Sequence, residues 1–138
     1  MTVEDATAVA RLATQLGYPS TASQIERRFH ALEESHSARV LIAEGPDRAV
    51  LGWVHVYGKR LLVSDTYAEI GGLVVDEAAR GRGVGSALMA SAEAWARERG
   101  YEVVSVPTNV IRVEAHEFYK SRGYQVLKSQ YKLRKRLV

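Results

Sequence analysis

The sequence contains no cysteine and no long hydrophobic segment. Without cysteine, the chain can form no disulfide framework, thiolate zinc site or iron–sulfur cluster, and it has no cysteine nucleophile. No apolar run approaches the ~20 residues that a membrane-spanning helix needs. The first residues also lack the basic and apolar regions of a secretory signal. We therefore expect a cytoplasmic protein that has no membrane partner.

Acidic residues are missing from the last eleven positions, and this accounts for the positive charge of the chain. The 138 residues include 19 Lys and Arg against 16 Asp and Glu, for a net charge of +3. Five of the basic residues stand at positions 128–138, so the preceding 127 residues carry fourteen bases and sixteen acids, a net charge of −2. Basic and apolar residues alternate over 130–137, which predicts an edge strand whose charges discourage unwanted pairing. A nucleic-acid partner is therefore not predicted.

Hydrophobic residues make up 46% of the sequence and charged residues 25%, which is typical of a globular protein, and we expect one domain over residues 1–138. Apolar spacing predicts four helices, the second capped by Ser23. Trp53 and Tyr57 alternate on a predicted strand and are expected to pack in the core, and Gly58-Lys59 is expected to form a tight turn. The predicted helices cover residues 6–16, 23–35, 83–99 and 112–122, and the strands 38–44, 49–57, 61–63, 67–75, 103–106, 124–127 and 130–137. The resulting order, ααββββαβαββ, predicts an α+β fold, an α/β sandwich of helices on a mixed, mostly antiparallel sheet.

A glycine-rich loop between a strand and a helix is the most informative motif. Gly81, Gly83 and Gly85 alternate with other residues, and Arg80 and Arg82 lie among them. Backbone N–H groups at a helix N-terminus attract anions, and glycines let a phosphate approach the backbone closely. The spacing matches neither a Walker loop nor a Rossmann fingerprint. The motif indicates a phosphate-binding loop, and the alternative is a flexible turn with solvated charges.

The pattern Arg80-x-x-Gly83-x-Gly85 after a strand resembles the acetyl-CoA pyrophosphate loop of the GNAT superfamily of N-acetyltransferases. The downstream stretch from Asn109 to Tyr124, with Phe118-Tyr119 in its second half, resembles another pattern common in that superfamily. The order of the predicted elements matches as well, so the resemblance extends over nearly the whole chain. It implies a single GNAT domain.

The resemblance implies acetyl-CoA as the cosubstrate. No metal is expected, because His30, His36 and His55 have no partner at ligand spacing. In the superfamily, the strand that corresponds to residues 67–75 splays from the strand that corresponds to 103–106. Pantetheine pairs with the exposed edge, and a backbone N–H near Leu73 polarises the thioester carbonyl. Asn109 could equally cap the following helix. The positions implied to bind the cosubstrate are Leu73, Val74, Val75, Arg80, Gly81, Arg82, Gly83, Val84, Gly85, Ser86 and Asn109.

Two side chains take catalytic roles by the same resemblance. Tyr119 stands where the family's tyrosine protonates the departing CoA thiolate, although it could instead pack with Phe118 against the sheet. Glu69 precedes Arg80 by eleven residues, which is the spacing of the general base in some histone-acetylating members. An alkylamine of pKa ~10.4 needs such a base, because freeing its lone pair at pH 7 costs about 4–5 kcal/mol. The other interpretation of Glu69 is a polar residue on the half-exposed end of a strand.

The expected reaction is acetyl transfer to a primary amine, by direct attack in a ternary complex. No covalent enzyme intermediate is needed, which agrees with the missing cysteine. The short loops and small size favour a small-molecule acceptor over a protein lysine or N-terminus. A non-catalytic acyl-CoA-binding module is a further alternative. A homodimer is left open, since dimers are common in that superfamily.

Overall fold

The computed structural model describes residues 1–138 as two compact units, Met1–Pro107 and Thr108–Val138. The first unit contains the whole sheet and three of the four α-helices, and the second contains the remaining helix. None of the helices is both long and apolar enough to span a membrane.

The sheet of the first unit has four strands in the order β1-β2-β3-β4. The strands β1 (Ala38–Glu44), β2 (Val50–Leu61) and β3 (Ser64–Val75) are antiparallel neighbours. The short strand β4 (Val104–Ser105) runs parallel to β3 and pairs only with Ala68 and Glu69. The predicted α+β class, with a mixed and mostly antiparallel sheet, is confirmed.

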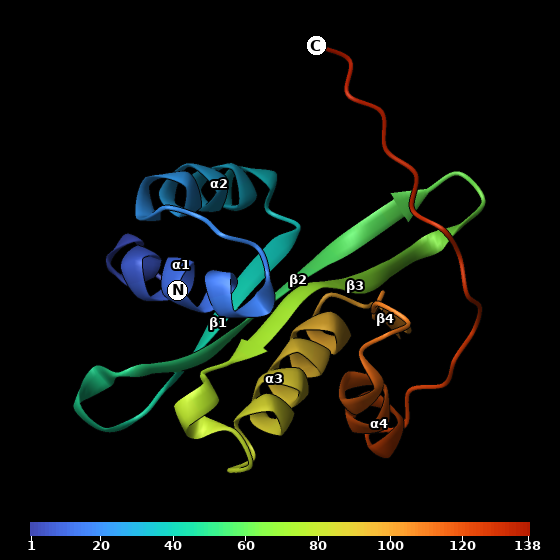
Figure 1. The fold of residues 1–138 in the computed structure, drawn as a ribbon. Helices are drawn as coiled ribbons and strands as arrows, with labels where there is room; N and C mark the ends of the chain where they lie inside the picture. Colours follow the sequence, from blue (N-terminus) through green and yellow to red (C-terminus); the bar gives the residue numbers. More distant parts are fainter. The chain divides into compact units, whose positions relative to one another are not determined.

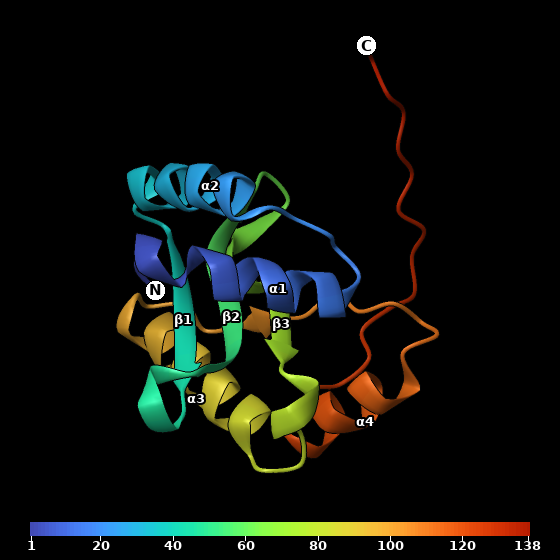
Figure 2. The ribbon, with the colours of Figure 1, turned by 60° about the vertical axis from the view of Figure 1, so that its left-hand side comes forward.

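Helices cover both faces of this sheet. The helices α1 (Ala6–Leu16) and α2 (Ala22–Ser35) lie on one side, and α3 (Val84–Glu98) lies on the other (Figure 1). Figure 2 shows α1 crossing the three long strands. Apolar residues at helical and alternating spacing meet between the layers, because burying one stripe of each element requires a facing partner. The largest fully buried side chains are Leu12, Val54, Val56 and Met89.

The start of α2 differs from the prediction that Ser23 caps it. Thr21 is the N-cap residue: its hydroxyl accepts a hydrogen bond from the Gln24 N–H at 3.1 Å, and the Gln24 side chain accepts one from the Thr21 N–H at 3.0 Å. This capping box satisfies two N–H groups at once. Ser23 lies inside the helix, so its predicted role is wrong.

The predicted turn at Gly58-Lys59 and the separate strand at 61–63 are also wrong. β2 continues through both residues to Leu61, which pairs with Ser64, so the hairpin turns at residues 62–63. The Gly58 N–H donates to the carbonyl of Ser37 at 2.9 Å. A Cβ at Gly58 would collide with the Tyr101 hydroxyl. Close packing against Tyr101, and not a turn, therefore explains this glycine.

The second unit is built on α4 (Val113–Ser121). The helix ends in backbone hydrogen bonds from Gly123 to Lys120 and from Tyr124 to Tyr119, both at 3.0 Å. Residues 124–138 form no helix or strand, so the strands predicted at 124–127 and 130–137 are wrong. An alternating pattern supplies one face of a strand, but a strand also needs a neighbour for its backbone hydrogen bonds. The observed order of helices and strands is ααβββαβα.

Candidate functional site

The glycine loop, which we define as residues 80–86, follows β3 and the short 3₁₀ turn Glu77–Ala79, and its last three residues form the first turn of α3. Gly81 and Gly83 have φ values of +79° and +81°, in the left-handed region where a side chain is strained. No heavy atom lies within 4 Å of the position that a Cβ would take at either glycine. The backbone of the loop therefore borders open space.

The first turn of α3 presents N–H groups that have no acceptor in the protein. Gly83 is the N-cap residue, and the first helical N–H with a backbone acceptor is that of Ala87, which donates to the Gly83 carbonyl at 3.0 Å. None of the hydrogen bonds in the structure uses the N–H groups of Val84, Gly85 or Ser86. These groups form the positive end of a fifteen-residue helix, where an anion is stabilised.

The two arginines of the loop contact its own backbone. The Nε of Arg80 donates to the Val75 carbonyl at 3.2 Å, and the Nη2 of Arg82 donates to the Ala78 carbonyl at 3.1 Å. Both side chains are exposed at the edge of the loop. Their predicted contact with a phosphate stays a prediction.

Helix α1 holds the segment that leads into the loop. Asp76 accepts hydrogen bonds from the Ala78 N–H at 3.2 Å and from Arg11 at 2.9 Å, and these partners hold the pKa of its carboxyl below the usual value. The side-chain oxygen of Gln15 accepts from the Glu77 N–H at 3.1 Å. Sequence reasoning missed Arg11 and Gln15. Their only signal was that two long polar side chains stand four positions apart on a mostly apolar helix.

The edge of β3 that faces β4 is open over most of its length. β4 pairs with β3 at Ala68 and Glu69 only, so the two strands part there, as the resemblance implies. Leu73, Val74 and Val75 pair with β2 on one side and have no strand on the other. The open edge leads directly into the glycine loop.

Glu69 lies on β3 at the point where β4 ends, and only 8% of it is exposed. Its carboxylate accepts a hydrogen bond from the Tyr57 hydroxyl at 2.5 Å, and the Lys59 Nζ lies 3.2 and 3.3 Å from its two oxygens. We call these three residues the Glu69 cluster. Burial raises the pKa of Tyr57, and the hydrogen bond to the Glu69 carboxylate and its charge raise it further. The Glu69 carboxylate is therefore paired with the primary ammonium group of Lys59.

The prediction that Tyr57 packs in the core misses its role in this cluster. Tyr57 is half-buried, but its hydroxyl is bonded to a charged group. Tyr57 and Lys59 stand two residues apart on β2, and Tyr57 is directly opposite Glu69. Because alternate residues share a face of a strand, the register of the hairpin would have revealed the cluster, but a turn misplaced at Gly58 hid it.

Replacing Tyr57 with Phe should lower the free energy of unfolding by about 1.5–3 kcal/mol, because the buried Glu69 carboxylate loses a hydrogen-bond donor. Urea denaturation at pH 7 measures this. The matched control is Tyr18→Phe, since Tyr18 is 70% exposed and its hydroxyl makes no hydrogen bond. Equal stability of the two variants would contradict the assigned hydrogen bond.

The predicted residues of the second unit lie on and just before α4. The Tyr119 ring contacts Phe118 and Tyr124 edge to face, with centroids 5.2 and 5.8 Å apart. Its hydroxyl makes no hydrogen bond in the structure. Burial raises the pKa of the Tyr119 phenol, and the positive charge of Arg112 opposes that shift. The phenol therefore keeps its proton at neutral pH.

Asn109 takes part in a local turn before α4. Its side-chain oxygen accepts from the Ile111 N–H at 3.1 Å, and its carbonyl lies 2.8 Å from the His116 Nε2. The N-cap residue of α4 is Arg112, so Asn109 does not cap the helix itself. A cosubstrate contact by Asn109 stays a prediction.

Comparison with known proteins identifies relatives along most of the chain. The sequence profile of the Acetyltransferase (GNAT) family matches residues 6–124. An aminoglycoside N(6')-acetyltransferase type 1 of Stenotrophomonas maltophilia is 28% identical over 128 residues, which cover 90% of this chain and 82% of that enzyme. An aminoalkylphosphonate N-acetyltransferase of Salmonella typhimurium is 46% identical over 57 residues, or 41% of this chain and 37% of that enzyme.

Solved structures show the same fold. The crystal structure of an aminoglycoside antibiotic 6'-N-acetyltransferase from Acinetobacter haemolyticus matches with a TM-score of 0.83 at 18% identity. The match covers 100% of this chain and 97% of that one.

Proposed function

Because the chain belongs to the GNAT acetyltransferase family and is an acyltransferase, we propose that it transfers the acetyl group of acetyl-CoA to a primary amine of a small molecule. The observation that carries this proposal is the open edge of β3, which runs from the Glu69 cluster into the glycine loop. The aminoglycoside and aminoalkylphosphonate relatives are named for small amines, which supports an acceptor of this class.

The residues of the first unit fit the cosubstrate. The unpartnered N–H groups of Val84, Gly85 and Ser86 would bind the pyrophosphate, with Gly81 and Gly83 leaving the backbone accessible. Arg80 and Arg82 would turn from loop carbonyls to the phosphates as charge-assisted donors. The unpaired edge over residues 73–75 would hold the pantetheine arm. When bound, acetyl-CoA supplies the acetyl group as an activated thioester.

The proposed chemistry needs three proton movements. Glu69 binds the acceptor ammonium in place of Lys59 and takes one proton, so that the amine nitrogen can form the new bond to the acetyl carbon. The bond from that carbon to sulfur breaks, Tyr119 gives its proton to the departing thiolate, and the acetylated nitrogen loses its second proton, which restores the Tyr119 phenol. The Leu73 N–H polarises the carbonyl oxygen while negative charge develops on it. Direct attack requires no nucleophile from the protein.

The test of the proposed function is release of CoA from acetyl-CoA in the presence of a panel of primary amines, measured with a thiol reagent. Amine-dependent release together with an acetylated small amine in the mass spectrum supports it. Release only with lysine peptides or protein N-termini would instead identify a protein acetyltransferase. Acetyl-CoA binding without any release would identify a non-catalytic acyl-CoA-binding module.

Gly83→Glu should weaken acetyl-CoA binding by at least ~100-fold, because the carboxylate would occupy the phosphate position and repel it. Isothermal titration calorimetry measures this affinity. Gly100 offers a matched control: it ends the same helix, has the same φ of +81° and also borders open space. Gly100→Glu introduces the same strain and charge, so it should bind acetyl-CoA like the wild type. Equal affinities of the two variants would contradict the pyrophosphate role of the loop.

A further inference from the structure

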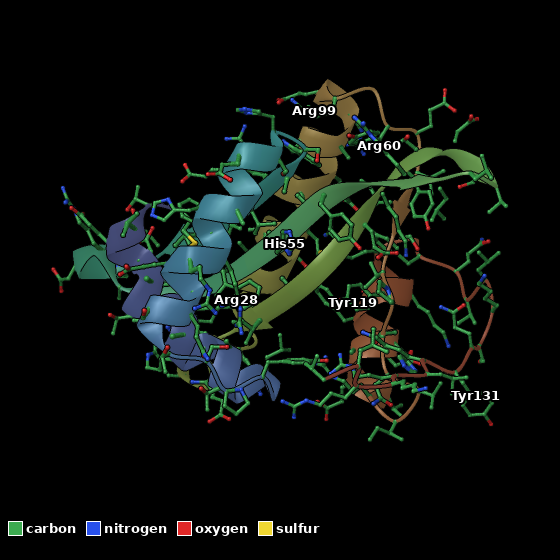
Figure 3. All side chains as sticks on the ribbon, turned by 90° about the horizontal axis from the view of Figure 1, so that it is seen from above. Arg28, His55, Arg60, Arg99, Tyr119 and Tyr131 are labelled. Atoms are coloured by element: carbon green, nitrogen blue, oxygen red, sulfur yellow. The ribbon has the colours of Figure 1, made fainter.

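Four alternate residues of β2 share one face of the sheet. Trp53, His55, Tyr57 and Lys59 stand two positions apart, and the Trp53 Nε1 donates to the Val9 carbonyl of α1 at 3.3 Å. This face is therefore the one that α1 and α2 cover. Figure 3 looks down on that side and shows His55 on β2. The Glu69 cluster lies on the same face, because its Tyr57 follows His55 by two residues on β2.

A β-bulge in β3 places two glycines beside these side chains. His55 pairs with Gly72 and Val56 pairs with Ile70, so Gly71 is the extra residue. A Cβ at Gly71 would collide with the Nδ1 of His55. A Cβ at Gly72 would lie 2.9 Å from the Trp53 ring. Gly71 is exposed and has no side chain. The Nδ1 of His55 therefore lies next to the surface at this residue of the bulge.

The His55 imidazole makes no hydrogen bond. Its Nε2 is buried without a partner, and none of the hydrogen bonds in the structure uses its Nδ1. The ring stacks on Tyr57 with centroids 5.4 Å apart, which fixes its plane. Burial lowers the pKa of His55, so the ring is neutral at pH 7 and offers one donor and one acceptor. Nδ1, which lies next to the Gly71 opening and is not among the buried unpartnered atoms, is therefore the ring atom that a ligand can reach.

We propose that His55 binds a hydroxyl group of the acceptor through the opening at Gly71, while Glu69 binds the acceptor's amine. This inference rests on the proposed function and narrows the acceptor to an amino alcohol. A hydroxyl both donates and accepts, so it can pair with the Nδ1 of a neutral imidazole in either tautomer.

The strand sets the spacing of the two groups in the acceptor. His55 and Tyr57 are two residues apart, which is ~6.8 Å along an antiparallel strand, and Tyr57 stands opposite Glu69. An extended chain of four carbons between nitrogen and oxygen spans about this distance. Because these side chains project from backbone positions ~6.8 Å apart, the amino alcohol chosen for the test is 4-aminobutan-1-ol, and 2-aminoethanol serves as the shorter analogue.

The experiment compares 4-aminobutan-1-ol with butylamine in the wild type and in His55→Phe, whose ring preserves the stacking on Tyr57. We expect the ratio of kcat/KM for the two amines to be at least ~10 in the wild type and near one in the variant. The hydroxyl preference should also be lost with 2-aminoethanol against ethylamine. An equal ratio in both proteins, or a wild-type preference for 3-aminopropylphosphonate, would overturn the inference.

Failure of the proposed function gives a different result. If no amine releases CoA, the function is wrong, and the His55 inference is decided by NMR of the wild-type imidazole during titration with the same two amines. A shift of the His55 ring resonances with 4-aminobutan-1-ol but not with butylamine supports the site, and no shift overturns it. The same titration decides the question if His55→Phe fails to fold. His30→Phe, at an exposed histidine, controls for loss of an imidazole.

Discussion

Tyr119→Phe should lower kcat for acetyl transfer by ~10²–10⁴-fold and leave the KM for acetyl-CoA nearly unchanged. The variant keeps the ring and its contacts with Phe118 and Tyr124, so only the proton that neutralises the leaving thiolate is lost. Thiol release under saturating amine measures the effect. Tyr131→Phe, at a tyrosine that is 95% exposed, serves as the control. A variant as fast as the wild type would show that another group is the acid.

The pH dependence provides a second readout for Tyr119. Burial raises the pKa of this phenol above its usual value near 10, so the proton donor is present throughout the neutral range and is lost only when the pH rises past that raised pKa. The wild-type kcat should therefore fall at strongly alkaline pH. The slow Phe variant should lack this alkaline limb.

Glu69→Gln should lower kcat/KM for the acceptor at pH 7 by ~10²–10³-fold, because the amide cannot take the proton of the incoming ammonium. The loss should shrink as the pH rises. An alkylamine of pKa ~10.4 becomes neutral in solution tenfold more often with each pH unit up to that value, so it needs the base less. In the variant, log(kcat/KM) should therefore rise with a slope near one between about pH 7 and pH 9.

The control for Glu69→Gln must separate chemistry from stability, since Glu69 is buried and holds two partners. Glu102→Gln changes the same group at an exposed position. Acetyl-CoA affinity and the urea midpoint of both variants report on folding. A Glu69→Gln enzyme with wild-type kcat/KM at pH 7 would mean that Glu69 only anchors Tyr57 and Lys59.

The sequence predicts well the features that consecutive residues determine. It predicts poorly the features that depend on the pairing of two strands or on contacts between distant residues. The glycine loop could be predicted because a helix start and its glycines lie within a few consecutive residues. The end of the hairpin could not be predicted, because apolar alternation is compatible with a turn at Gly58. In the structure β2 pairs with β3 beyond Gly58, and this glycine packs against Tyr101. The same error removed Lys59 from the strand and with it the Glu69 cluster.

The anchoring of the loop by α1 likewise depends on contacts between distant residues. Arg11 and Asp76 are 65 positions apart, and no local pattern links them. The family resemblance supplied the roles of Glu69 and Tyr119, but it gave no information on the side chains around them. His55 is a further example, because its position against Gly71 follows from a bulge whose register the sequence does not specify.

The hydrogen bonds of Arg11 and Gln15 to the segment before the glycine loop have a consequence for entropy. They fix the start of the loop to a helix that is itself packed on the sheet, and Gly81 and Gly83 then hold the left-handed geometry that leads into α3. The conformational freedom of this segment is therefore lost during folding and not on ligand binding. The N–H donors are therefore already in place when a phosphate binds. A smaller part of the binding free energy is then lost to ordering the protein than with a flexible loop.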